Sequence, residues 1–158
     1  MEASETGASV DVAKAGAEGL RPETQPELHL TVANEDYLEC IVRIEREDGE
    51  TQGVRSVDIA TRLGVSKASV NKAVASLKAQ ELVEQSHYGK VMLTPRGRKI
   101  GETVWRRHRL LRAFLVKELG VPFERADNEA CMMEHALSKD TMERWLDYLE
   151  CQGIHIEA

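Results

Sequence analysis

The sequence predicts a mainly α-helical protein, in which a winged helix-turn-helix domain is followed by an all-helical domain. Two short amphipathic patterns on either side of a glycine turn predict the helix-turn-helix. Two alternating segments around a second turn predict a β-hairpin wing. Three further helical patterns, the first of which begins at residue 95, predict the second domain. The composition agrees, since 42% hydrophobic and 30% charged residues are ordinary for a globular protein.

The first 33 residues are predicted to form a mostly disordered tail. They are rich in Ala, Gly, Glu, Thr and Pro, and they hold too few large apolar side chains to offset the entropy of ordering. They resemble neither a secretory signal nor a transit peptide, and no apolar run approaches the roughly 20 residues that span a bilayer. Three widely spaced cysteines do not make a disulfide framework, so a reducing cytoplasm is the expected location, with no membrane partner.

A first helix is predicted over residues 35–47, with Asn34 as its N-cap. Its apolar side chains share one stripe, which a core would bury. Asp36 and Glu39 lie on a different face of this helix. Core packing therefore does not dictate the identity of these two carboxylates.

A helix-turn-helix is predicted next. Ser56 should cap a short helix that ends in a turn at Gly64, and Ser66 should cap a second helix over residues 67–80. The second helix of such a unit meets base edges with its outward N-terminal end, where small polar and basic side chains suit hydrogen bonding. The candidate DNA contacts at that end are Lys67, Ala68, Ser69, Asn71 and Lys72.

A β-hairpin wing follows, with strands at 82–85 and 90–93. His87 and Tyr88 lie at its tip, where they are predicted to contact the minor groove or phosphates; an exposed turn without contacts is the alternative. Pro95, at a first helical position, then starts a helix that runs to about residue 118.

Two more helices complete the second domain, one over residues 123–136 and one that begins after Ser138. The domain boundaries predicted from these elements are 1–33 for the tail, 34–100 for the winged helix and 101–158 for the helical domain.

The charge is distributed unevenly along the chain. Residues 55–112 hold 13 Lys/Arg and 4 Asp/Glu, whereas the rest of the chain holds 8 and 23, for a net charge of −6. A basic middle in an acidic protein suits the binding of a polyanion, because neutralisation of phosphates supplies most of the non-specific affinity for DNA. A solvated basic helix face is the alternative interpretation.

A cluster of possible metal ligands follows the winged helix. Cys131, Glu134 and His135 are three and four residues apart, which places a thiol, a carboxylate and an imidazole on neighbouring positions of a helix. These donors together suit a late first-row divalent ion. Cys40 and Cys151 lack such neighbours and are predicted to be packing residues. A chain with both features is predicted to be a metal sensor that controls a promoter.

Five stretches of the chain resemble the diphtheria toxin repressor and manganese transport regulator family. They occur in the family's order and cover roughly residues 34–150. The resemblance implies a metal-dependent repressor of metal-uptake genes, with a winged-helix DNA-binding domain and a helical dimerisation domain but without the SH3-like domain of the iron-type members. The stretches are Tyr37–Glu39, the helix-turn-helix from Ile59 to Val70, Leu93–Gly97, Arg107–Leu111 and Cys131–Ser138.

The resemblance also implies a set of metal ligands. Asp36 resembles the manganese-type residue of the first helix, whereas Cys131 resembles the iron-type thiolate. Arg112 and Asp127 stand where iron-type members have ancillary-site ligands, so an iron-type ancillary site is not expected, while a second ion bridged by Glu134 or another carboxylate stays open. The implied ligands are Asp36, Glu39, His108, Cys131, Glu134 and His135.

The sequence therefore predicts a homodimer that binds palindromic operator DNA when it is loaded with Mn²⁺ or Fe²⁺, with a slight preference for Mn²⁺ because three carboxylates outnumber one thiol. Two other functions stay open. A winged-helix repressor that senses an organic ligand would use the same DNA module without needing six metal donors. A zinc hydrolase would need an open coordination position and a general base, and it would leave the basic helix-turn-helix without a role.

Overall fold

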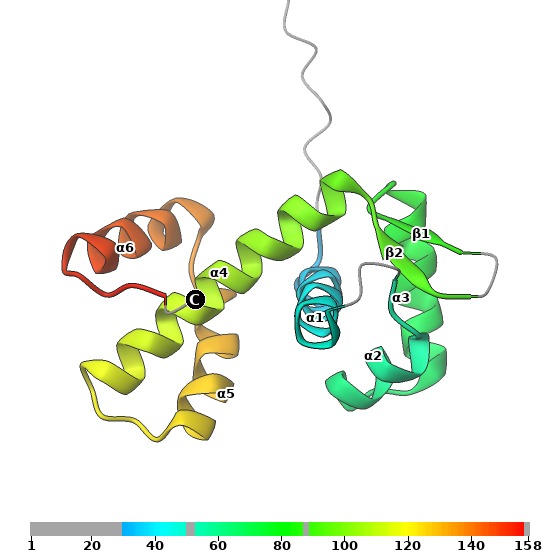
Figure 1. Cartoon of the computed structure of the whole chain (residues 1–158). Helices are drawn as coiled ribbons and strands as arrows, with labels where there is room; N and C mark the ends of the chain where they lie inside the picture. Colours follow the sequence, from blue (N-terminus) through cyan, green and yellow to red (C-terminus); the bar gives the residue numbers. More distant parts are fainter. Residues whose placement is uncertain (1–29, 50–52, 87–88, 157–158) are drawn as a thin grey trace, which may run out of the picture.

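The computed structural model describes residues 30–49, 53–86 and 89–156, and within them it is mainly helical (Figure 1). The wing-tip residues His87 and Tyr88 and most of the expected tail lie outside the described residues. Among the described residues, no helix is both long and apolar enough to cross a membrane. The elements are α1 Val32–Asp48, α2 Ser56–Leu63, α3 Lys67–Ala79, β1 Val83–Gln85, β2 Val91–Leu93, α4 Pro95–Lys117, α5 Phe123–Glu134 and α6 Lys139–Cys151.

Helix α1 begins three residues earlier than predicted, and Thr31 rather than Asn34 is its N-cap. The Thr31 hydroxyl accepts a hydrogen bond from the Asn34 backbone N–H at 3.2 Å. The Asn34 side chain is instead buried and donates to Ser76 Oγ on α3 at 3.3 Å. Asn34 therefore joins two helices of the first domain, which is a tertiary role that its capping propensity conceals.

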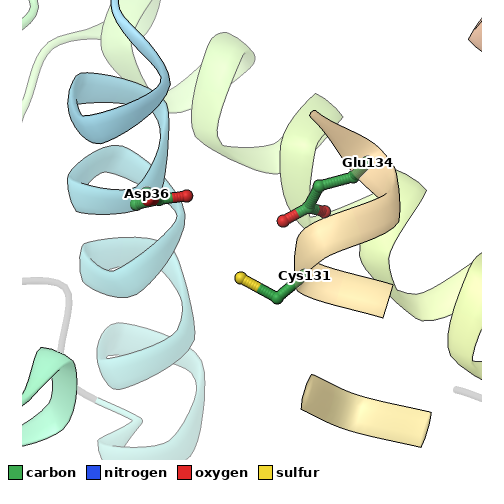
Figure 2. A group of neighbouring side chains, drawn as sticks. All are labelled: Asp36, Cys131 and Glu134. Atoms are coloured by element: carbon green, nitrogen blue, oxygen red, sulfur yellow. The ribbon is translucent and has the colours of Figure 1, made fainter. Parts of the chain in front are cut away.

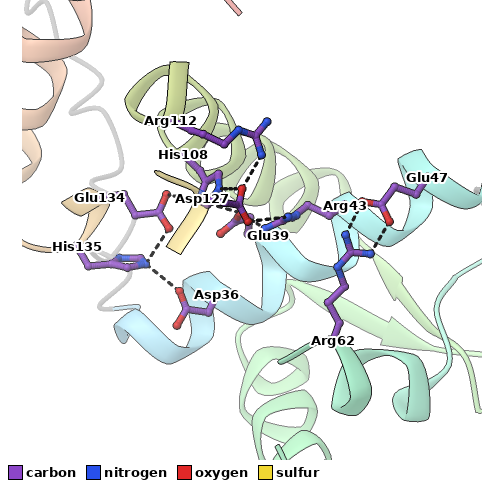
Figure 3. Close-up of polar contacts among 10 residues, drawn as sticks. All are labelled: Asp36, Glu39, Arg43, Glu47, Arg62, His108, Arg112, Asp127, Glu134 and His135. Carbon is purple, nitrogen blue, oxygen red and sulfur yellow. Dashed lines mark hydrogen bonds and ion pairs between the residues drawn. The ribbon is translucent and has the colours of Figure 1, made fainter. Parts of the chain in front are cut away.

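Helices α2 and α3 form the predicted helix-turn-helix. Gly64 ends α2 in the left-handed region, at φ 64°, and the Ser66 hydroxyl caps α3 by accepting from the Ser69 backbone N–H at 3.1 Å. The predicted cap at Ser56 is wrong by one residue, because Arg55 holds that position and makes no side-chain capping bond. Arg62 on α2 pairs with Glu47 on α1, which fixes the unit against the first helix (Figure 3).

The wing is shorter than predicted, with two antiparallel strands in which Val83 pairs with Leu93. A single bridge from Val54 to Val91 extends it on the other edge. The buried side of this hairpin closes the first hydrophobic core, to which α1, α2, α3 and both strands contribute.

Helix α4 joins the two halves of the molecule and crosses α1 closely (Figure 1). The close approach depends on two glycines. A Cβ at Gly101 would lie 2.8 Å from the Leu38 carbonyl oxygen, and one at Gly97 would lie 1.9 Å from that of Leu82. Larger residues at either position would push α4 away from the first domain. The N-terminal half of α4 is thereby held against α1 and the wing.

The second core lies around the C-terminal half of α4, where α5 and α6 pack against it. Ala126 and Ala130 are fully buried one turn apart on α5, so this helix can lie close to α4. Of the two cysteines predicted to pack, Cys40 is buried, but Cys151 is exposed, so that part of the prediction is wrong. The predicted boundary between residues 100 and 101 falls within the continuous helix α4.

Candidate metal centre

Three helices bring the six expected ligands together between the two cores. Asp36 and Glu39 extend from α1 and His108 from the middle of α4, while α5 supplies the others at its C-terminal end. Helix α5 ends at Glu134, two residues earlier than predicted, and His135 is its C-cap. The sequence-predicted donors are therefore neighbours in space, although up to 99 residues separate them along the chain.

An inner group of donors is buried almost completely. Its members are Glu39, His108 and Glu134, whose residues are 4%, 1% and 3% exposed. Their ligand atoms all lie within 4.8 Å of one another. His108 Nδ1 is 3.8 Å from Glu39 Oε1 and 3.8 Å from Glu134 Oε2, so one nitrogen faces two carboxylates.

The inner group contains polar atoms that lack hydrogen bonds within the described part of the chain. They are Glu39 Oε1, His108 Nδ1 and both carboxylate oxygens of Glu134. Buried polar atoms without partners cost free energy, and native proteins rarely tolerate several in one place without an ion or water. Two carboxylates and an imidazole nitrogen that converge in this way suit a divalent cation as the missing partner.

An outer group lies beside it and shares Glu134. Its members are Asp36, Cys131 and Glu134, whose ligand atoms also lie within 4.8 Å of one another. Figure 2 shows the Asp36 carboxylate of α1 facing Cys131 and Glu134 across the gap to α5. Asp36 and Cys131 are only partly buried, and the thiol makes this group softer than the inner one.

His135 lies at the edge of the outer group, outside both sets of mutually close donors. Its Nε2 is 2.8 Å from Asp36 Oδ1 and 3.4 Å from Glu134 Oε1 (Figure 3). Its other ring nitrogen, Nδ1, is 3.3 Å from Glu35 Oε2, an interaction that the sequence analysis missed. The histidine therefore joins the start of α1 to the end of α5 through carboxylates.

Without a cation, burial and neighbouring charges raise the pKa of several side chains in the site and so favour their protonated forms. Burial, reinforced by the Glu134 carboxylate, raises the pKa of Glu39. Burial, with carboxylates nearby, also raises the pKa of Cys131 to about 11. Hydrogen bonds that the His135 ring donates to the carboxylates of Asp36, Glu134 and Glu35 raise the pKa of His135 to about 12. A metal ion must displace such protons, so protons and metal compete for these side chains.

A second set of side chains surrounds His108 and was also missed as an interacting group. Asp127 lies 2.8 Å from His108 Nε2 and accepts from Arg112 at 2.6 Å. Arg43 lies 3.5 Å from Glu39 and 3.7 Å from Asp127. The spacing of four residues between Glu39 and Arg43 signals their pairing on a helix, but no sequence pattern signals the contacts of Asp127.

The N-terminal end of α3 is exposed at all five positions expected to contact DNA, which are Lys67, Ala68, Ser69, Asn71 and Lys72. The Ser69 hydroxyl contacts the Ser66 hydroxyl at 2.9 Å. Because all five side chains are exposed among the described residues, this end of the helix is open to a partner.

The fold and the donor cluster define a class of protein: winged-helix DNA-binding regulators with a helical metal-binding domain. Two family profiles match the chain and divide it near the start of α4. One, described as the N-terminal DNA-binding domain of iron-dependent repressors, matches residues 29–91. The other, described as their metal-binding and dimerisation domain, matches residues 94–151. The chain belongs to this family of metal-dependent transcriptional repressors, whose members are regulators rather than enzymes.

Curated relatives agree with the family assignment. The chain is 34% identical over 131 residues to the transcriptional regulator MntR of Salmonella typhimurium, a match that covers 83% of this chain and 81% of the relative. It is 36% identical over 120 residues to the HTH-type transcriptional regulator MntR of Bacillus subtilis, covering 76% of this chain and 82% of that one.

Solved structures agree on the fold but are longer. A manganese-dependent transcriptional repressor in complex with manganese is 35% identical with a TM-score of 0.63, and the match covers 74% of this chain and 52% of that one. The manganese regulator SloR is 28% identical with a TM-score of 0.62, and the match covers 74% and 53%. This chain therefore spans about half the length of these solved proteins.

Proposed function

We propose that this protein is a homodimeric repressor that binds a palindromic operator when Mn²⁺ or Fe²⁺ occupies the inner and outer groups. The observation that carries the proposal is the convergence, from α1, α4 and α5, of buried donor atoms that lack hydrogen bonds within the described residues. Helix α1 belongs to the DNA-binding domain, whereas α5 belongs to the helical domain. An ion bound by residues of both helices would therefore depend on the relative placement of the two domains.

The side chains would couple metal binding to DNA binding through that placement. Without a cation, Glu39 and Glu134 oppose each other across the inner group, and whenever both carboxylates are ionised their repulsion favours separation of α1 from α5. Asp36, Glu39 and Glu134 would hold a divalent cation, whose positive charge would offset this repulsion and link α1 to α5. The coupling is a population shift, limited by the difference in affinity between the two arrangements.

A shared carboxylate gives the site room for more than one ion. Glu134 contributes to both groups, and its two oxygens can bridge neighbouring cations. The described donors therefore support two adjacent positions, one lined by carboxylates and imidazole and one that includes the Cys131 thiol. We propose both positions for the same class of divalent ion.

The donors favour Mn²⁺ slightly over Fe²⁺. Three carboxylates are hard ligands of the kind that Mn²⁺ accepts, whereas the Cys131 thiolate favours softer ions. The relatives named above as manganese regulators support this preference. Affinity alone does not name the physiological ion, because it rises from manganese towards copper for most donor sets.

The proposal is tested by gel retardation with DNA selected from a random pool by the Mn²⁺-loaded protein. We expect EDTA to weaken retardation by about 5- to 150-fold, the range of ordinary allosteric coupling, and Mn²⁺ to restore it. The selected sequences should be palindromic, with half-sites about one helical turn or a multiple apart. Retardation that persists in EDTA and is released by an organic ligand would instead support the other class of winged-helix repressor.

The proposed reading helix is tested separately. Reversal of charge at both Lys67 and Lys72 removes exposed cations from the start of α3 without touching the core. We expect weaker binding to all sequences and a salt dependence that is shallower by about one unit per lost phosphate contact. Lys139→Glu on α6 is a matched control, since that side chain is also exposed but lies far along the chain from α3. Unchanged affinity in the folded double variant would exclude α3 as the reader.

A further inference from the structure

Asp127 is placed where one carboxylate oxygen meets two donors. Its Oδ1 lies 2.8 Å from His108 Nε2 and accepts from Arg112 Nη1 at 2.6 Å, and both partners are on α4 (Figure 3). Its Oδ2 lies 3.7 Å from Arg43 Nη2 on α1. Asp127 itself is on α5, four residues before Cys131. This one carboxylate therefore links α5 to both other helices of the candidate metal centre, yet it is not among the mutually close donors.

The contact with His108 fixes how the imidazole faces the inner group. The His108 side chain is 1% exposed, so bulk water does not reach its ring nitrogens. With Nε2 directed at a carboxylate that only accepts hydrogen bonds, Nε2 must carry a proton. The lone pair available to a cation is then on Nδ1, the atom that faces Glu39 and Glu134 at 3.8 Å. A partner on the second ring nitrogen commonly orients a metal-binding histidine in this way.

Aromatic rings hold the cations that neutralise Asp127. The Arg112 guanidinium lies 4.7 Å from the centre of the Phe123 ring and 5.6 Å from that of Trp105. The Arg43 guanidinium lies 4.6 Å from the centre of the Trp105 ring. The same ring stacks on the His108 ring, with 5.4 Å between the two ring centres. Such contacts stabilise a guanidinium in a fixed position. Arg112 and Arg43, which are not metal ligands, thereby keep the Asp127 carboxylate charged and oriented towards His108.

We propose that Asp127 is a positioning residue that presents His108 Nδ1 to the metal, with Arg112 and Arg43 as its permanent counter-ions. The proposal rests on the proposed metal-binding function. It gives a role to an aspartate and an arginine that the sequence analysis treated only as signs that an ancillary site is missing. It also accounts for the orientation of the His108 ring, in which Nε2 contacts Asp127 while Nδ1 has no hydrogen bond to any described residue.

The first test reads the imidazole directly in the metal-free protein. A ring N–H that is buried and hydrogen-bonded to a carboxylate exchanges slowly with water and gives a downfield proton resonance coupled to its ¹⁵N. We expect this Nε2–H resonance in the native protein and in Asp127→Asn, because the amide oxygen is the atom that both His108 and Arg112 can use. We expect its loss in Asp127→Ala. A resonance that persists in a folded Asp127→Ala protein would overturn the proposal.

The second test reads metal affinity by titration with Mn²⁺ followed by electron paramagnetic resonance. Loss of the residue that hydrogen-bonds to the second nitrogen of a metal-binding histidine commonly lowers metal affinity by about 10–100-fold, and we expect that loss for Asp127→Ala. Asp127→Asn should retain most of the affinity. An alanine variant that binds as tightly as the native protein, or an asparagine variant that behaves as the alanine one does, would contradict the role.

Controls separate this role from general damage and from failure of the proposed function. Asp140→Ala removes an aspartate that also pairs with an arginine, Arg144, but is exposed on α6, and it should change neither readout. If Asp127→Ala does not fold, Asp127→Leu, which is similar in size and accepts no hydrogen bond, replaces it. If the native protein binds no Mn²⁺, the proposed function fails, whereas the His108 resonance still decides whether Asp127 holds the ring.

Discussion

The inner and outer groups share one carboxylate but differ in burial and in what satisfies their other members. Glu39 and His108 of the inner group are buried and lack a hydrogen bond at the atoms that face each other. Asp36 of the outer group has a side chain that is 33% exposed and is paired with His135 at 2.8 Å. The outer group can therefore persist with protons, water and His135, whereas the inner group is incomplete without a cation.

This difference separates two properties of a metal sensor. A buried set of donors that lack hydrogen bonds within the described part of the chain gains most from a cation, so the inner group should supply most of the affinity. A partly exposed set with a thiol and competing protons gains less free energy from a cation, but its affinity differs more from one metal to another. We therefore expect substitutions in the two groups to change different observables.

The largest effect is expected at the carboxylate that both groups share. Glu134→Gln keeps the size of the side chain but removes the charge from both groups at once. The metal-induced gain for operator DNA should disappear in gel retardation, while weak, salt-sensitive binding to any DNA remains, because the basic surface of α3 is unchanged. Glu124→Gln, in the exposed first turn of the same helix, is the control. A full metal response in Glu134→Gln would exclude this residue as a ligand.

The next largest effect distinguishes the groups by a matched pair of substitutions. Glu39→Gln affects only the inner group, and Asp36→Asn affects only the outer group. We expect Glu39→Gln to lower Mn²⁺ affinity by more than about 100-fold, which exceeds the usual cost of losing a residue that only hydrogen-bonds to a metal ligand. Asp36→Asn should lower the affinity by less. The rise in melting temperature on adding Mn²⁺ to each purified variant measures both losses. Equal losses would show that the inner group does not dominate the affinity for Mn²⁺.

The sequence could predict much of this arrangement, and the exceptions have physical causes. The helix starts at Ser66 and Ser138 follow from local capping, which involves residues within one turn and can therefore be predicted from the sequence. Thr31 and Asn34 are both good caps, and the choice between them depends on the burial of Asn34 against α3, a tertiary contact. Local rules cannot decide between two residues that both satisfy them.

The candidate site shows the same limit more strongly. Spacing could place Cys131 and Glu134 on one face of a helix, but their approach to Asp36 depends on how α1 packs against α4 through Gly101. The resemblance to a known family supplied that missing long-range information. It did not supply the contacts of Asp127, because the residues at this position and its partner differ from the iron-type pattern and meet only in the folded chain.

A smaller effect is expected from pH. Elevated pKa values at Cys131 (about 11) and His135 (about 12) mean that both are protonated at pH 7 without metal. A cation that binds a deprotonated side chain displaces its proton, so affinity should rise with pH by up to about tenfold per unit for each proton released. Calorimetric titration in two buffers of different ionisation enthalpy counts these protons. The native protein should release more than Cys131→Ser, and equal release would show that the thiol does not take part.

The smallest effect, in affinity for Mn²⁺, is expected from Cys131→Glu. This change replaces the one soft donor of the outer group with a third carboxylate and leaves the inner group untouched. Hard oxygen donors suit Mn²⁺, whereas loss of the thiolate removes the preference for softer ions. We expect Mn²⁺-dependent retardation to stay within about tenfold of the native protein, while the responses to Co²⁺ and, under anaerobic conditions, Fe²⁺ weaken more. Cys151→Glu, which changes an exposed thiol on α6, controls for the added charge. If the native protein instead responds to Fe²⁺ but not to Mn²⁺, and Cys131→Glu abolishes that response, the outer group determines an iron sensor and the preference for manganese is wrong.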